Sequence, residues 1–135
     1  MAAVAGLYQQ FQDCRVQILA ISTDSVLSHK VFHEISPHAR QVTFPLLADR
    51  TGDIAKSYGV YSSKGTAYRA TFLIDPIGII RHYAVYPDEV GREINEVLRV
   101  VKGLQIYDQT QQLEPAGWLP GMAGIQPMIQ NAGYM

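Results

Sequence analysis

The sequence predicts an α/β fold in which a parallel strand lies between helices and an antiparallel strand pair precedes a terminal helix. Three observations carry this prediction. Residues 16–21 form a nearly continuous apolar run, as in a strand that is covered on both faces of a sheet. Residues 69–83 contain two apolar stretches joined by the turn sequence Asp-Pro-Ile-Gly at 75–78. The segments around them repeat apolar residues every three or four positions, which indicates amphipathic helices.

The first half of the chain supplies the parallel part of this fold. Residues 1–12 place their apolar side chains on one helical face, and the strand at 16–21 follows. Ser22 to Ser25 is rich in helix-capping residues, so a second helix is expected there, closed by Pro37. Its apolar residues repeat every four positions. Residues 44–47 predict a short extended segment.

The second half supplies the hairpin and the last helix. Asp49 to Thr51 can cap a brief helix that ends at Gly59, and the hairpin follows a polar loop. The last helix is expected from about Val90 to Gly103. From Asp108 the chain is rich in Gly, Pro, Gln and Met, with Trp118 as its one large anchor. We therefore expect a core over residues 1–106 and a C-terminal tail over residues 107–135.

This order of elements is the thioredoxin-type order with its first strand removed. In that arrangement the missing strand is central, between the strand at 16–21 and the first hairpin strand at 71–74. Either these two strands close on each other, or rows of unpaired backbone groups remain inside the sheet. Each such group costs about 1 kcal/mol or more when it is buried. We therefore expect marginal stability.

Composition excludes several classes of function. With 135 residues, 47% of them hydrophobic and 17% charged, the chain is typical of a globular protein. Eleven basic residues against twelve acidic ones leave no basic excess for nucleic acid or an anionic membrane surface. No apolar run approaches the roughly 18 residues that span a bilayer. One cysteine permits no internal disulfide and fits a reducing compartment, so a cytoplasmic protein is expected.

Two groups of reactive side chains are better explained by structural roles than by catalysis or metal binding. Cys14 lies where the first helix ends, and the negative partial charge of a helix C-terminus disfavours a thiolate, so catalysis by Cys14 is not expected. His29 and His33 have a spacing that can hold a metal, with His38 nearby, but no further ligand is evident. A solvated helix face explains the histidines, and neither a metal nor a cofactor is expected.

Several segments together resemble one enzyme family. From Ala2 to about Gly121 the chain resembles the typical two-cysteine peroxiredoxins, that is, the alkyl hydroperoxide reductase and thiol-specific antioxidant family. Six segments in the family's order make the resemblance specific. The segments are Ile21-Ser22-Thr23-Asp24-Ser25, Phe44-Pro45-Leu46-Leu47-Ala48-Asp49, Ala55-Lys56-Ser57-Tyr58-Gly59-Val60, Tyr68-Arg69-Ala70-Thr71-Phe72-Leu73-Ile74-Asp75, Val90-Gly91-Arg92-Glu93 and Pro115-Ala116-Gly117-Trp118.

The resemblance implies a thioredoxin-like fold and a thiol peroxidase. Such enzymes reduce hydrogen peroxide and alkyl hydroperoxides with a cysteine thiolate, and a thioredoxin-like or other thiol reductant regenerates them. Arg69 matches the arginine that faces the thiolate and the peroxide, and Arg92 matches a supporting arginine. The resemblance also implies a homodimer through the edge strand at 79–85, and possible higher rings.

Both thiols of the family's cycle are missing from this chain. The Pro-x-x-x-Thr-x-x-Cys loop is nowhere in the sequence, and Met1 aligns a few residues after the peroxidatic cysteine. Glu114 stands where the family has its resolving cysteine. We therefore expect the C-terminal portion of a peroxiredoxin, inactive as given, which was either started at an internal methionine or is a fragment. A non-catalytic scaffold or holdase-like remnant of the family is the alternative.

Overall fold

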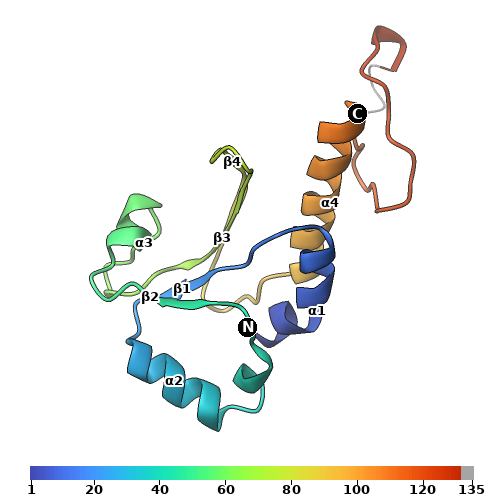
Figure 1. The fold of residues 1–135 in the computed structure, drawn as a ribbon. Helices are drawn as coiled ribbons and strands as arrows, with labels where there is room; N and C mark the ends of the chain where they lie inside the picture. Colours follow the sequence, from blue (N-terminus) through green and yellow to red (C-terminus); the bar gives the residue numbers. More distant parts are fainter. Residues whose placement is uncertain (132–135) are drawn as a thin grey trace. The chain divides into compact units, whose positions relative to one another are not determined.

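The computed structural model describes residues 1–131 and shows the predicted order of helices and strands (Figure 1). The chain forms two compact units, Met1–Ile94 and the residues from Asn95 onward. The predicted division between residues 106 and 107 stays a prediction. None of the helices in the described part is long and apolar enough to cross a membrane.

The first unit begins with helix α1 and a parallel strand pair. α1 (Ala2–Asp13) agrees with the prediction and packs Tyr8 edge-on against Phe44, with ring centroids 5.4 Å apart. Strand β1 (Ala20–Ser22) is much shorter than the predicted strand. It exists only where it pairs in parallel with β2 (Leu46–Ala48), because residues 16–19 have no strand partner in the described structure.

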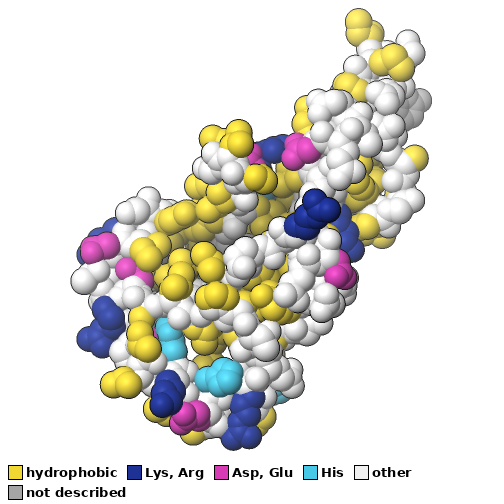
Figure 2. Space-filling model, in the orientation of Figure 1, with side chains coloured by type: hydrophobic (Ala, Val, Ile, Leu, Met, Phe, Trp, Pro, Cys, Tyr) yellow, Lys and Arg dark blue, Asp and Glu magenta, His cyan; other side chains and the backbone are white. Residues whose placement is uncertain are grey.

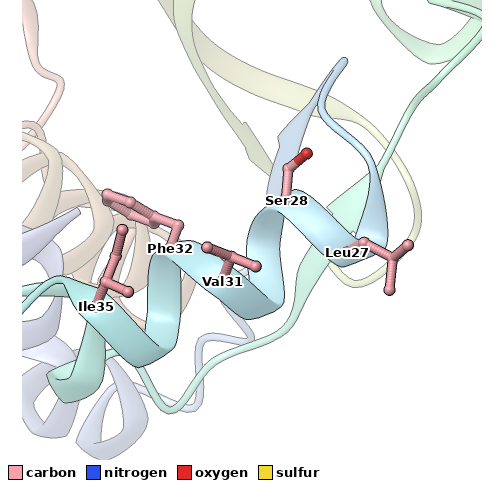
Figure 3. A pocket seen from close by; sticks show the side chains of 5 residues that line it. All are labelled: Leu27, Ser28, Val31, Phe32 and Ile35. Carbon is pink, nitrogen blue, oxygen red and sulfur yellow. The ribbon is translucent and has the colours of Figure 1, made fainter.

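Helix α2 (Val26–Ile35) has the predicted cap but does not bury its apolar face. The Ser28 N–H donates to Ser25 Oγ at 3.0 Å, as the capping residues indicated. Leu27 and Ile35 are nonetheless 74% and 70% exposed, and no residue of α2 is buried. Figure 3 shows the apolar side chains of this helix lining a shallow hollow. The amphipathic pattern predicted the helix correctly, but nothing in the described structure covers its apolar face.

Asp49 organises the end of the parallel strand pair and the start of the next helix. Its side chain is only 5% exposed. The carboxylate accepts the N–H groups of Ile54 (3.2 Å) and Ala55 (2.9 Å) in α3 (Asp53–Ser57), as the predicted cap requires. A 3-10 turn, η1 (Ala39–Gln41), precedes β2.

The predicted hairpin is the most extensive strand pairing in the described structure. β3 (Arg69–Ile74) and β4 (Ile80–Tyr86) are antiparallel, with an irregularity in register between Leu73 and Ile74. In the turn, Asp75 Oδ1 accepts the N–H groups of Ile77 (3.1 Å) and Ile79 (2.9 Å). Gly78 has φ +88°, the left-handed geometry that the turn sequence predicted.

The strands form two separate sheets. β1 pairs only with β2, and β3 pairs only with β4. Of the two arrangements that the sequence left open, β1 and β3 therefore do not close on each other. Each keeps one edge without a strand partner among residues 1–131.

The second unit corrects the predicted bounds of the last helix. Helix α4 runs from Ile94 to Thr110, so it starts four residues after Val90 and passes through Gly103. Gly103 is buried inside this helix and does not terminate it, and a Cβ there would lie at an ordinary contact distance of 3.7 Å from Trp118. Trp118 is 1% exposed and donates its Nε1–H to the Met122 carbonyl, which confirms its role as an anchor. The short helix η2 (Ile129–Asn131) follows.

Candidate anion site beside the hairpin

Arg69 begins strand β3 and carries a largely available guanidinium. It lies opposite Tyr86 in the hairpin register. Its Nε is 4.0 Å from Asp88 Oδ1, and the two side chains are 49% and 61% exposed. An ion pair this long and this exposed contributes little to stability. The Arg69 guanidinium can therefore bind another anion without losing a strong partner.

Arg92 is held against the backbone of the same strand. Its Nη1–H donates to the Ala70 carbonyl oxygen at 3.0 Å. Burial, and secondarily the positive charge of Arg69, lower the pKa of Arg92 from its ordinary value. The structure therefore brings Arg69 and Arg92 together, while the catalytic and supporting roles that the resemblance implied stay predictions.

The amino group of Met1 is the third cation at this place. Its pKa lies below the ordinary value because the group is partly buried and because the positive charges of Arg92 and Arg69 disfavour a further proton. Met1 also precedes the first turn of α1, where the helix leaves unsatisfied N–H groups. The two guanidiniums and the N-terminus of α1 thus lie near one another, and they are chemically suited to an oxyanion or a thiolate.

Glu114 belongs to the second unit and has its own surroundings there. Its Oε2 approaches Gly103 of α4. Its Oε1 is buried and has no hydrogen-bond partner in the described part of the chain. The pKa of Arg99 is raised mainly by its hydrogen bonds to Glu96, and the charge of Glu114 adds to this. The match of Glu114 to the family's resolving-cysteine position stays a prediction; a carboxylate there could not form a disulfide.

Cys14 and His29 occupy structural positions. Cys14 is the C-cap residue of α1, and its N–H donates to the Gln10 carbonyl at 3.2 Å. His29 Nε2 lies 2.7 Å from Ser22 Oγ, so one of its ring nitrogens is already engaged. Within residues 1–131 no group of three or more His, Cys, Asp or Glu side chains could hold a metal ion.

Two members of the site escaped sequence reasoning. Asp88, the ion-pair partner of Arg69, lies just after β4 in a stretch that showed no motif. The Met1 amine reaches the arginines only through the packing of α1. The register of the hairpin could have indicated Asp88, because residues just past Tyr86 must lie near Arg69. No sequence signal places the amine.

Comparisons with known proteins agree on one family. The profile of the AhpC/TSA family matches residues 1–83. The selenocysteine-containing peroxiredoxin PrxU of Peptoclostridium acidaminophilum is 39% identical over 133 residues, which are 94% of this chain and 66% of that protein. A peroxiredoxin of Thermoplasma volcanium is 38% identical over 89% of this chain. The chain spans only 61% of the Thermoplasma protein, so these relatives are longer than the match.

Solved structures show the same fold. The reduced 2-Cys peroxiredoxin of Plasmodium vivax matches with a TM-score of 0.86 and 28% identity, over 96% of this chain and 68% of that one. A cysteine-to-serine mutant of peroxiredoxin 6 of Arenicola marina matches with a TM-score of 0.84 and 30% identity, over 93% and 63%. The predicted thioredoxin-like peroxiredoxin fold is confirmed. The absence of its N-terminal strands stays a prediction.

Proposed function

The chain belongs to the AhpC/TSA family of peroxiredoxins, and from this premise we propose that it is the arginine-bearing C-terminal portion of a thiol peroxidase. The complete enzyme would reduce hydrogen peroxide and alkyl hydroperoxides and would be regenerated by a thioredoxin-like or other thiol reductant. It would work in the cytoplasm, a reducing compartment in which a catalytic thiol stays reduced.

One observation carries this proposal: Arg69 and Arg92 converge at the N-terminus of α1. A thiolate at this place gains the attraction of two guanidiniums and of the helix dipole, so its population at neutral pH rises. The same groups stabilise the negative charge that leaves the peroxide oxygen when the O–O bond breaks. Arg69 is the more exposed and would face the thiolate and the peroxide, while Arg92, held by the Ala70 carbonyl, would fix the geometry.

The chain itself is proposed to be inactive. Its one cysteine, Cys14, lies at the other end of α1 from the N-terminus of the helix, about 17–18 Å away by the rise of a twelve-residue helix. Glu114 leaves no resolving thiol. If a thiol upstream completed the site, its sulfenic acid would have to be reduced directly by an external thiol.

A second candidate, an oligomeric scaffold or holdase-like remnant, is favoured by the amount of exposed apolar surface. Figure 2 shows hydrophobic side chains over much of the visible surface. Edge strand β4 contributes Ile80, Tyr83 and Val85, which are 46%, 66% and 49% exposed. An uncovered apolar edge favours pairing with another chain. We therefore propose a homodimer through the edge strand at 79–85, for either function.

The proposed role of the arginines is testable by placing a thiol beside them. In a Cys14→Ser background, Ala2→Cys puts one thiol in the first turn of α1, and Gln10→Cys puts one on the exposed surface of its last turn. Thiolate absorbance is titrated against pH in both. The thiol introduced at position 2 is expected to have a pKa at least one unit lower, because two guanidiniums and the helix N-terminus stabilise its anion.

Adding Arg69→Met to both variants distinguishes the effect of Arg69 on the thiol pKa from the effect of the helix N-terminus. This substitution should raise the pKa of the thiol at position 2 and slow its reaction with hydrogen peroxide. The thiol at position 10 should respond to neither change. Equal titration of the two thiols, or no response to Arg69→Met, would contradict the proposed function.

A further inference from the structure

We propose that Met122 is a modification site, at which a hydroperoxide reversibly oxidises the thioether sulfur and thereby weakens the hydrogen bond to the Trp118 indole. The site belongs to the second compact unit, in the segment that follows helix α4. Hydroperoxides are the substrate class of the proposed function, but this oxidation needs no catalytic activity of the chain. The support comes from the contacts within one loop and does not rest on the proposed function.

Residues 113–125 form a loop whose two ends are joined by hydrogen bonds. The Leu113 N–H donates to the Ile125 carbonyl and the Ile125 N–H donates to the Leu113 carbonyl, both at 2.8 Å. Inside the loop Trp118 is 1% exposed, and Arg99 of α4 donates its Nη1–H to the Trp118 carbonyl at 3.2 Å. The loop is therefore held at its base and at the backbone of Trp118.

Met122 closes the tip of this loop through its N–H, its carbonyl and its sulfur. The Met122 N–H donates to the Leu119 carbonyl at 3.0 Å, and Gly121 has the φ of +100° that such a turn requires. The Met122 carbonyl accepts the Nε1–H of Trp118 at 3.0 Å, and the Met122 Sδ accepts the Leu119 N–H at 3.3 Å. The acceptor of the buried indole and the sulfur thus belong to one residue.

The sulfur of Met122 is accessible to an oxidant in solution. Met122 is 57% exposed, and the hydrogen bond from Leu119 engages one lone pair of a weak acceptor, so the second lone pair stays available. This lone pair attacks one oxygen of the hydroperoxide, an S–O bond forms and the O–O bond breaks. The other oxygen takes the proton of the transferred oxygen and leaves as water or an alcohol. The sulfur gives up an electron pair and becomes a sulfoxide, and the peroxide is reduced.

Oxidation removes the acceptor of the Leu119 N–H. The sulfur of a sulfoxide carries a partial positive charge, which disfavours the nearby N–H, and its new oxygen is polar and favours water. The side chain of Met122 therefore moves away from Leu119, and the carbonyl of the same residue shifts relative to Trp118. A buried indole N–H without an acceptor is unfavourable, so we expect the indole to open more often to solvent.

Met128 offers the same chemistry without the connection to Trp118. It is 49% exposed, similar to Met122, and its Sδ accepts a side-chain N–H of Gln130 at 3.8 Å. Its carbonyl accepts the backbone N–H of Asn131, whereas the indole donates to Met122. Oxidation of the two methionines should therefore affect Trp118 differently, which makes Met128 the matched control.

Hydrogen exchange of the indole N–H tests the proposal, because Trp118 is the single tryptophan and gives one indole signal in NMR spectra. The full chain with Cys14→Ser is treated with hydrogen peroxide, and oxygen addition at each methionine is followed by peptide mass spectrometry. As Met122 is oxidised, indole exchange should accelerate about tenfold, because one hydrogen bond of a buried group is lost. Reduction by methionine sulfoxide reductases should restore the original rate.

Two variants assign the response to one sulfur. Met128→Leu should respond to peroxide as the parent does. Met122→Leu keeps an apolar side chain of similar volume and should show unchanged indole exchange while Met128 is oxidised. The reductase step uses the chain with Met122 in place, so it stays informative even where Met122→Leu alters the loop. The proposal would be overturned by a Met122 that stays unoxidised while Met128 reacts, or by an indole that ignores Met122 oxidation. An equal response in Met122→Leu, or no recovery after reduction, would overturn it as well.

Discussion

The hairpin and the parallel strand pair belong to the same compact unit but are specified in different ways. The hairpin pairs six residues of β3 with β4, and its turn is bonded by Asp75. The parallel pair is three residues long, and the helix that connects its strands buries no side chain. A hairpin needs only its own turn and cross-strand contacts. A parallel pair needs covering layers, and among the described residues β1 has a strand partner on one edge only.

This contrast explains which part of the described structure leaves its apolar side chains uncovered. The two arginines of the proposed site lie beside the hairpin, the region whose structure is determined locally, so their geometry does not depend on the parallel strand pair. The parallel region keeps its apolar side chains exposed, as α2 shows. Substitutions in the two regions should therefore lower the free energy of unfolding by different amounts. The effects below are ordered from the largest to the smallest.

Asp49→Ala should cause the largest loss, because one buried carboxylate links β2 to α3. The change leaves the Ile54 and Ala55 N–H groups without their acceptor. We expect the free energy of unfolding to fall by about 3 kcal/mol, measured by urea denaturation. Asp49→Asn keeps one acceptor oxygen and should lose roughly half as much. Equal stability of both variants and the parent would show that the parallel region does not depend on this cap.

Asp75→Ala should have a smaller effect on the hairpin. It removes the acceptor of two turn N–H groups and the 3.6 Å contact with Arg81. Turn N–H groups near the surface can bond to water instead, so we expect a loss of about 1–2 kcal/mol by the same denaturation. Asp75→Asn, which retains the Oδ1 acceptor, is the matched control. A loss larger than that of Asp49→Ala would reverse the proposed ranking.

Gly78→Ala tests backbone geometry alone. No atom outside the neighbouring residues lies within 4 Å of the position that a Cβ would take, so the substitution causes no clash. The φ of +88° nevertheless disfavours any residue with a Cβ. A loss of about 1 kcal/mol is expected. Gly91→Ala, whose Cβ also meets open space and whose φ is not positive, should change stability less.

Val31→Ala should be nearly silent. Val31 is 52% exposed on α2, whereas Val42 in the same unit is 5% exposed. The exposed substitution should change the free energy of unfolding by about 0.5 kcal/mol or less. The matched Val42→Ala should cost about 2 kcal/mol through lost burial and a cavity. Equal costs in the two valines would mean that the apolar face of α2 is covered in solution.

Local chemistry accounts for most of what the sequence predicted correctly. The Asp-Pro-Ile-Gly turn, the Ser25 cap and the Asp49 cap depend on neighbouring residues and were found where expected. The errors arise from tertiary contacts. β1 is short because strand length depends on a partner, and α4 continues through Gly103, which is buried near Trp118 and so does not end the helix as its residue type indicated.

The candidate site was predictable only in part, for the same reason. The resemblance identified Arg69 and Arg92 by their segments, and the structure brings them together. The Met1 amine and Asp88 reach the site through the packing of α1 and the hairpin register. Neither carries a motif that could be found in one sequence.

The central claim is that this chain holds the cationic side of a peroxide site without its thiol. The most direct measurement is the rate of hydrogen peroxide consumption by the purified chain with dithiothreitol in excess. We predict the rate of dithiothreitol alone, unchanged by Cys14→Ser and by Arg69→Met. Catalytic turnover that Cys14→Ser abolishes would contradict the account.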